Sequence, residues 1–228
     1  MRRISQIVLP ILLLASTPVI GAKPPDTWEG LLRLHSNKMD AIYLLPDADF
    51  RSYTKVMLDP TQIAFRKNWQ RDQNTQMDMG KHISNKEAQD ILERAKTGFD
   101  RLFAEAYQKA GYQVVTAPGP DVLRVSTAVI NLDVVAPDTM EAGRSWTFSR
   151  EAGGATLVLE ARDSTTGAVL GRAVDARSTG DSRPYLRDSV SNSSEFEDLF
   201  KRWAQLSANG LTELKARSPV DANGLARK

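Results

Sequence analysis

The chain contains no cysteine among its 228 residues. It therefore has no disulfide, no thiol redox centre and no thiolate ligand for a metal. A chain of this length can still be stabilised by burial of an apolar core. A bacterial lipoprotein carries its lipid on a cysteine directly after the signal peptide, and that position holds Lys23 here. We therefore expect a protein without a lipid anchor.

Histidine is nearly as scarce, with His35 and His82 as the two in the sequence. The sequence has no H-E-x-x-H, no G-x-S-x-G and no glycine-rich phosphate loop. These short motifs would indicate metalloprotease, serine-hydrolase or nucleotide chemistry. The sequence therefore predicts no catalytic residue, no cofactor and no metal centre, and it favours a protein that is not an enzyme.

Neither sign of charge is in excess. The chain has 30 basic and 28 acidic side chains, without a sustained run of lysine or arginine. Binding to nucleic-acid phosphates or to anionic lipids needs such a concentration of positive charge. We expect neither a nucleic-acid partner nor an electrostatic membrane anchor.

The first 22 residues have the pattern of a secretory signal peptide. Arg2 and Arg3 precede an apolar stretch over residues 7–15, and small residues close the segment at Ala22. The apolar stretch is shorter than the roughly 20 residues of a membrane-spanning helix. We predict that residues 1–22 are cleaved and that the mature chain lies in the periplasm without a transmembrane segment. Loss of the two arginines leaves 28 basic and 28 acidic side chains.

The rest of the chain is predicted to form a single globular domain over residues 23–217 and a flexible tail over residues 218–228. Ser84 and Glu87 form a capping box before apolar residues with helical spacing, which predicts a helix that ends at Gly111. A second box, Ser194-Glu195-Phe196-Glu197, predicts the start of a closing helix.

Alternating or apolar runs predict the strands, and a Thr-Gly turn predicts a hairpin between the last two of them. We expect strands at residues 42–45, 53–58, 62–65, 112–116, 122–135, 155–162 and 168–177. Residues 28–34 are interpreted as one or two helical turns, and residues 70–83 as a loop. The predicted fold class is a two-layer α+β sandwich, in which two amphipathic helices cover one face of a largely antiparallel or mixed sheet of about five strands.

A long connection over residues 136–154 contains Trp146 and Phe148. Exposed aromatic side chains on such a loop are typical anchors for a protein partner. The alternative is that the loop folds back and buries both rings. Trp146 and Phe148 are therefore the candidate partner-binding residues.

Two other patterns suggest chemistry. Met77, Met79 and His82 are soft ligands within six residues, as in extracytoplasmic copper sites, although the favoured interpretation is a polar surface loop that happens to contain them. A hydrolase of envelope material would need two carboxylates about 5–10 Å apart. The candidate carboxylates for this alternative are Asp59, Asp133, Glu141, Glu151 and Asp163.

The segment Tyr53-Thr54-Lys55-Val56-Met57-Leu58-Asp59-Pro60-Thr61, with Phe65 and Trp69 downstream, resembles a bacterial family known as domain of unknown function 3313. Three further segments are similar to the same family: Gly30-Leu31-Leu32, Leu159-Glu160-Ala161-Arg162-Asp163 through Thr166-Gly167, and the helix of Trp203. The resemblance implies an envelope protein of Gram-negative bacteria, typically a lipoprotein, and it implies no catalytic residues. The missing lipid-carrying cysteine argues against anchoring in the outer membrane.

These observations favour a non-enzymatic soluble periplasmic protein, an accessory or binding module of the cell envelope whose partner is an envelope protein. The expected working surface is a sheet face or edge together with residues 136–154. A periplasmic hydrolase that uses carboxylates is the alternative, followed by a copper-binding protein.

Overall fold

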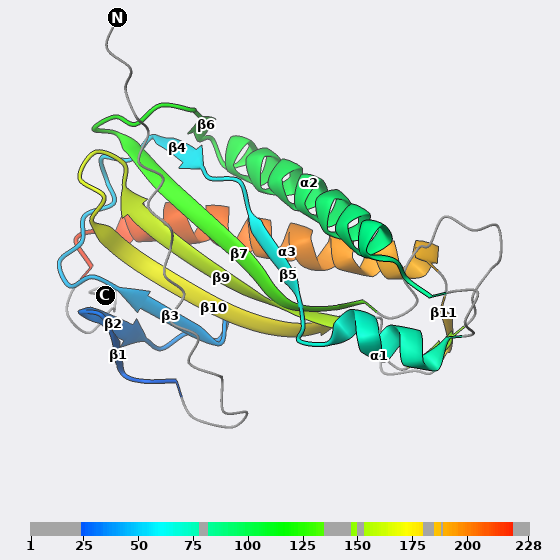
Figure 1. Ribbon diagram of the computed structural model, residues 1–228. Helices are drawn as coiled ribbons and strands as arrows, with labels where there is room; N and C mark the ends of the chain where they lie inside the picture. The colour runs from blue at the N-terminus through cyan, green and yellow to red at the C-terminus, as the bar shows by residue number, and fades with distance from the viewer. Residues whose placement is uncertain are drawn as a thin grey trace, which may run out of the picture.

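A computed structural model describes residues 24–77, 82–134, 147–149, 153–179, 185–187 and 189–220. Within these ranges nine strands form one mixed sheet, two strands form a separate pair, and three segments are helical (Figure 1). The predicted signal peptide and most of the predicted tail lie outside the described residues.

The long strands and the two long helices make up most of the described chain. The helices are α1 (Trp69–Gln76), α2 (Asn85–Lys109) and α3 (Ser189–Arg217). The strands are β1 (Thr27–Trp28), β2 (Leu31–Leu34), β3 (Ala41–Leu44), β4 (Lys55–Leu58), β5 (Gln62–Phe65), β6 (Gln113–Val114), β7 (Val122–Val134), β8 (Thr147–Ser149), β9 (Gly153–Asp163), β10 (Val169–Thr179) and β11 (Tyr185–Arg187).

The large sheet has the order β1-β2-β3-β10-β9-β7-β4-β6. Neighbours from β1 to β7 run antiparallel, whereas β4 is parallel to both β7 and β6. β5 also pairs in parallel with β7, farther along that strand than β4. The remaining pair is β8 with β11.

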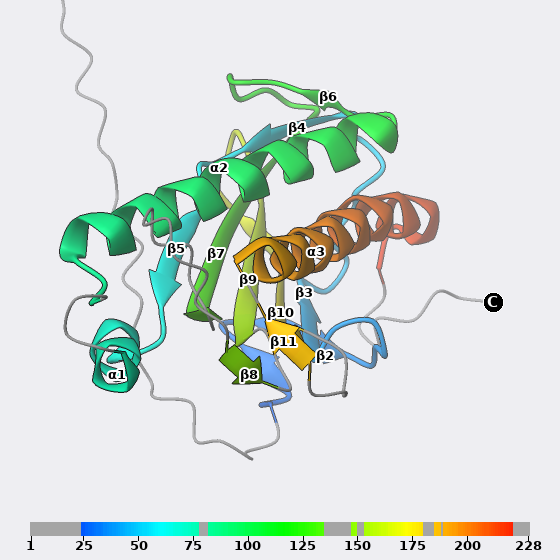
Figure 2. The same cartoon turned by 90° about the vertical axis from the view of Figure 1, so that its right-hand side faces the viewer.

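Helices α2 and α3 lie side by side on one face of the sheet (Figures 1 and 2). The capping box at the start of α2 is confirmed, because Ser84 Oγ accepts from Glu87 N–H and the Glu87 carboxylate accepts from Ser84 N–H at 2.8 Å. The main core lies between the helices and the sheet, with Phe99 and Trp203 fully buried against strand residues such as Val129 and Leu157.

The hairpin of β1 and β2 corrects the prediction of helical turns over residues 28–34. Trp28 pairs with Leu31, and the two residues between them, Glu29 and Gly30, have φ of 49° and 85°. A two-residue turn with positive φ at both positions matches the right-handed twist of an antiparallel pair. A positive φ is uncommon for glutamate, so the residue type at position 29 does not indicate this turn.

The prediction of a loop over residues 70–83 is also wrong for its first half, where α1 forms. This helix has little apolar periodicity, and its N-cap residue Asn68 is left-handed without a side-chain cap. Its position depends on Trp69, which is 1% exposed, stacks on Phe65 at 3.7 Å and donates from Nε1 to the Val134 carbonyl at 2.9 Å. Tertiary contacts therefore hold this helix, and local sequence does not reveal them.

Helix α3 begins at Ser189, so Ser194 of the predicted second capping box lies inside the helix. At the other end, Val220 is buried; its N–H donates to the Ala48 carbonyl at 3.1 Å and its carbonyl accepts from Asp47 N–H at 2.9 Å. Residues 218–220 of the predicted tail are thus packed against the segment that follows β3.

The α+β class is confirmed, but the predicted sandwich of about five strands and two helices is wrong. In the described part of the chain the large sheet has nine strands and there are three helices. Seven of the nine strands form where the sequence predicts strands, and the other two are β1 and β2, which form where helical turns were expected. The third helix is α1, which forms where a loop was expected.

Candidate functional site on the uncovered sheet face

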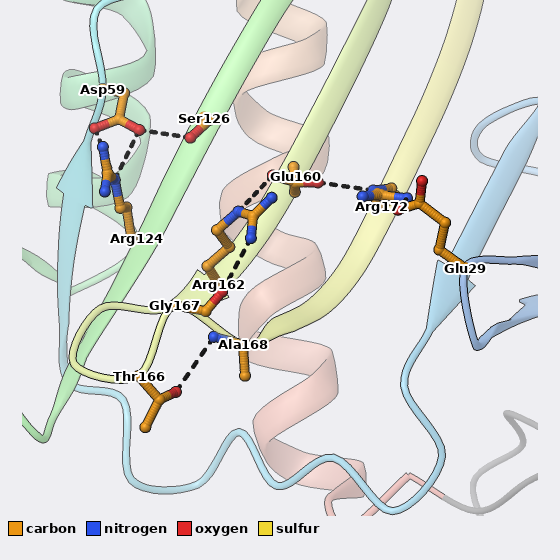
Figure 3. A network of polar contacts seen from close by, with 10 residues as sticks. All are labelled: Glu29, Asp59, Arg124, Ser126, Glu160, Arg162, Thr166, Gly167, Ala168 and Arg172. Carbon is orange, nitrogen blue, oxygen red and sulfur yellow. Dashed lines mark hydrogen bonds and ion pairs between the residues drawn. The ribbon is translucent and has the colours of Figure 1, made fainter. Parts of the chain in front are cut away.

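The face of the sheet opposite α2 and α3 carries most of the paired polar side chains of the long strands. We call it the uncovered face because, within the described residues, neither long helix packs on it. Side chains alternate between the two faces along each strand. In β7, Val125 and Val129 point into the core, whereas Arg124 and Ser126 point to the other face. Figure 3 shows that the polar side chains of β7, β9 and β10 gather on this face near the turn between β9 and β10.

A line of ion pairs crosses this end of the face, and we call it the charged row. It consists of Glu29, Asp59, Arg124, Glu160, Arg162 and Arg172. Glu160 is at its centre, with Oε1 2.6 Å from Arg162 Nε and Oε2 2.7 Å from Arg172 Nε (Figure 3). Three acids and three bases make the row neutral overall.

Arg172 is the most enclosed cation of the charged row, with a side chain that is 10% exposed. Its guanidinium lies 4.6 Å from the ring centroid of Trp28, and Trp28 meets Tyr43 edge to face at 5.5 Å. Nη1 is also 2.7 Å from Oε2 of Glu29. Burial lowers the pKa of Arg172, but the hydrogen bond to Glu160 and the ion pair with Glu29 outweigh it and raise the pKa, so this residue is a fixed positive charge.

Asp59 anchors the other end of the charged row. Its carboxylate accepts from Arg124 Nε at 2.9 and 3.0 Å and from the Ser126 hydroxyl at 2.5 Å. The Asp59 N–H donates to the Val125 carbonyl at 3.0 Å, so the residue continues the ladder between β4 and β7. The charge of the Asp59 carboxylate is thus already neutralised by Arg124 of the neighbouring strand β7.

Beyond the charged row, the same face has a central patch with little charge or hydrogen-bonding capacity. Its positions follow from the register, in which Ala128 pairs with Val158 and Val158 with Val174, while Ile130 pairs with Thr156 and Thr156 with Ala176. The central patch therefore consists of Ala128, Ile130, Thr156, Val158, Val174 and Ala176. All are half-buried except Ala176, which is exposed.

A second ion pair borders the opposite end of the central patch. Asp133 Oδ2 lies 2.9 Å from Nε of Arg66, which also pairs with Asp72 at 2.6 Å. Hydrogen bonds to Asp72 and Asp133 raise the pKa of Arg66 despite partial burial. The uncovered face thus has an apolar centre with paired charges at both ends.

The candidate partner-binding residues cannot be placed on this face. Trp146 lies outside the described residues. Phe148 lies in β8, where it pairs with Leu186 of β11, and its side chain is not described. Their role in partner binding remains a prediction.

The candidate copper ligands are only partly described. Met77 packs against the main core and His82 is exposed, whereas Met79 falls outside the described residues. In the described part of the chain, no group of three or more His, Asp or Glu side chains is arranged to hold a metal ion.

The described carboxylates of the hydrolase alternative each have their own partners. Asp59 is held by Arg124, and Asp133 by Arg66. Asp163 accepts from the Tyr53 hydroxyl at 2.8 Å and from the Thr166 N–H at 2.7 Å. Glu141 and Glu151 lie outside the described residues. Among the three carboxylates that can be placed, no hydrogen-bonding or ion-pairing partner is shared.

Sequence patterns assign no site to Glu160 and Arg172, the most enclosed members of the charged row, or to Trp28, which packs against Arg172. Glu160 and Arg162 do alternate with Leu159 and Ala161, so their common face could have been inferred. The contact of Arg172 with Trp28 could not, because it depends on the unpredicted hairpin of β1 and β2.

A pocket of about 220 Å³ lies on the helix side of the sheet, where β4 gives way to β5. Its lining comes from the end of β4 and the residues after it, from α2, and from β6 and β7. These residues are Leu58, Asp59, Pro60, Thr61, Asp100, Phe103, Ala104, Val114, Val125 and Thr127. The pocket shares only Asp59 with the charged row.

The profile of the family described as "Protein of unknown function (DUF3313)" matches residues 31–207, so the chain belongs to this family. The resemblance inferred from the sequence is therefore confirmed. No curated protein matches the chain. Among the described residues, no helix is both long and apolar enough to cross a membrane.

Several solved structures are similar at low identity. The PelC dodecamer from Paraburkholderia phytofirmans is 15% identical, with a TM-score of 0.33 over 72% of this chain and 96% of that one. A DUF330 protein from Xanthomonas campestris is 12% identical, with a TM-score of 0.37 over 73% and 86%. A putative neuraminyllactose-binding hemagglutinin homologue from Helicobacter pylori is 9% identical, with a TM-score of 0.38 over 75% and 91%. At these values no property is transferred to the chain.

Proposed function

We propose that the protein is a non-enzymatic binding module of the Gram-negative cell envelope, exported to the periplasm, which binds another envelope protein through the uncovered face of its sheet. The observation that carries this proposal is the apolar central patch between two sets of paired charges. Interfaces between proteins that associate reversibly commonly have an apolar centre and a polar rim.

The electrostatics of the face favour a partner that presents an apolar surface. The charged row contains three acids and three bases, and its most enclosed members are already paired. A neutral, internally paired rim does not attract a polyanion or a polycation over a distance. Binding should therefore depend weakly on ionic strength, because apolar contact at the central patch supplies most of the affinity.

Site-specific photocrosslinking in cells tests the surface. A photoreactive amino acid in place of Thr156 on the central patch should give a discrete crosslinked protein, whereas the same probe in place of Asn209, exposed on α3, should give none. Val158→Arg combined with Val174→Arg should abolish the product, and Asn209→Arg should leave it unchanged. Equal products at both positions, or a product insensitive to the paired arginines, would exclude the central patch as the interface.

Location is tested separately. The N-terminal pattern of residues 1–22 supports export, so protein released by osmotic shock should begin at Lys23 when its amino terminus is determined by mass spectrometry. Intact Met1 on protein recovered from the cytosol would contradict export. It would leave the role of the central patch open to the crosslinking result.

A further inference from the structure

We propose that the pocket beside the break between β4 and β5 binds a small protonated amine with a compact hydrocarbon group, and that Asp100 is the counter-ion of the amine. This site is on the helix side of β7 and does not depend on the partner surface proposed above.

A one-residue bulge opens the pocket. Leu58 pairs with Val125 and Gln62 with Ala128, so the chain from β4 to β5 advances by one residue more than β7 over this interval. Pro60 lies in the bulge and has no N–H to donate to the ladder. The bulge turns Thr61 inward, where it is 3% exposed and its hydroxyl lies 2.6 Å from that of Thr127.

Helix α2 closes the pocket from the other side. Asp100, Phe103 and Ala104 are three and four residues apart, so they lie on one face of the helix. Phe103 and the strand residue Val125 are buried and supply apolar walls. The small side chain of Ala104 keeps the space between them open.

The volume limits the size of the ligand. The pocket has about 220 Å³, compared with the cavity of about 150 Å³ that takes up benzene in a well-studied engineered protein. There is therefore room for a single six-membered ring and one polar group, but not for a nucleotide or an oligosaccharide.

The charges of the lining determine the sign of that polar group. The lining residues include two acids, Asp59 and Asp100, and no lysine, arginine or histidine. Asp59 is already neutralised by Arg124, whereas the Asp100 carboxylate has its hydrogen bond from Thr61 N–H to Oδ1, at 3.1 Å, and no ion pair within the described residues. Oδ2 of Asp100 can accept from an ammonium group, and apolar walls strengthen that attraction.

Titration of the isotope-labelled protein by NMR, with cyclohexylammonium as the probe, tests this site. We expect saturable shifts of the amides at residues 59–61 and 100–104. Cyclohexanol and cyclohexanecarboxylate, which match the ring without its positive charge, should bind about tenfold more weakly or not at all.

Two variants test separately the charge of Asp100 and the free volume of the pocket. Asp100→Asn keeps the acceptor for Thr61 N–H, so the fold is retained, and it should weaken cyclohexylammonium about tenfold. Ala104→Leu should block binding by filling the pocket. Asp90→Asn removes the same charge from the exposed side of α2 and should leave the affinity unchanged.

Three results would overturn the proposal. They are the absence of saturable shifts at the pocket with millimolar cyclohexylammonium, equal affinity for the ammonium and the alcohol, and an Asp100→Asn variant that binds as well as the parent protein. None of these results bears on the central patch, whose test is the crosslinking experiment.

Discussion

The hydroxyl of Tyr53 donates a hydrogen bond to Oδ2 of Asp163 at 2.8 Å. Tyr53 precedes β4 and Asp163 ends β9, so this bond spans the intervening strand β7. Both residues belong to segments on which the family resemblance depends. The bond therefore joins, in the folded protein, two sequence motifs that are about a hundred residues apart.

Loss of this bond should weaken the fold measurably. Tyr53 is 5% exposed, and burial, together with the bond to Asp163, raises the pKa of its hydroxyl. We expect Tyr53→Phe to lower the free energy of unfolding by about 1 kcal/mol, measured by urea denaturation. A double-mutant cycle with Asp163→Ala, which removes the acceptor, should give a coupling energy of at least ~0.5 kcal/mol. Strictly additive effects would show that the bond contributes nothing.

Asp163 should also make stability depend on pH. The N–H of Thr166, then the Tyr53 hydroxyl, hold the pKa of Asp163 below its ordinary value despite some burial. A carboxyl with a lowered folded-state pKa stabilises the protein above its unfolded-state pKa, and this contribution is lost as the pH falls through the folded-state value. Asp163→Asn should therefore cost about 1–3 kcal/mol at pH 7.

The cost of Asp163→Asn should shrink as the pH is lowered from 7 to about 2.5, in urea denaturation series of both proteins. Asp90→Asn is a matched control, because Asp90 is exposed and its pair with Lys86 is long, at 3.7 Å. A cost for Asp163→Asn that stays constant over this pH range would show that the carboxylate charge is not what stabilises the turn.

Asp175 is the most deeply buried carboxylate in the described part of the chain. It is 0% exposed, accepts from Trp203 Nε1 at 2.8 Å, and pairs with Arg177 at 2.8 Å. Asp175→Ala should cost about 3–5 kcal/mol in unfolding free energy, because it leaves the Arg177 charge and the indole N–H without their acceptor. The control is Asp198, whose side chain is exposed on α3. Asp198→Ala should change the unfolding free energy by less than about 0.5 kcal/mol. Similar effects of both variants would contradict this role for Asp175.

Sequence was informative where local signals and long patterns agree. The capping box of Ser84 and Glu87 and the stop at Gly111 located α2 to within one or two residues, and the long alternation of residues 122–135 located β7. The bond from Trp203 to Asp175 and the contact of Arg172 with Trp28 join residues far apart in the chain. No local pattern encodes such pairs, because they depend on which strands become neighbours.

The pocket, too, could be predicted only in part from local sequence patterns. The strands expected at residues 53–58 and 62–65 leave a break around Pro60, as the structure has it, but the pocket also depends on where α2 lies against these strands. Asp100 is an ordinary polar residue in an amphipathic helix when only the sequence is considered. Asp100 becomes a candidate binding residue only in the fold, where the bulge between β4 and β5 places Thr61 N 3.1 Å from the Asp100 carboxylate.

Two kinds of glycine in this chain should respond to alanine in opposite directions. Gly153 has a φ of 136°, and a Cβ there would lie 1.6 Å from the Asp133 carbonyl oxygen. Gly153→Ala should therefore cost about 3 kcal/mol or more, because both the φ angle and the strand contact must change.

Gly98 and Gly210 are inside α2 and α3, and a Cβ at either would meet no atom within 4 Å. Gly98→Ala and Gly210→Ala should each raise the unfolding free energy by about 0.5–1 kcal/mol, as helix propensity predicts. Thermal and urea denaturation of the three variants measure this difference. If Gly153→Ala were tolerated as well as the helical substitutions, this result would contradict the close contact between β7 and β9 at Gly153.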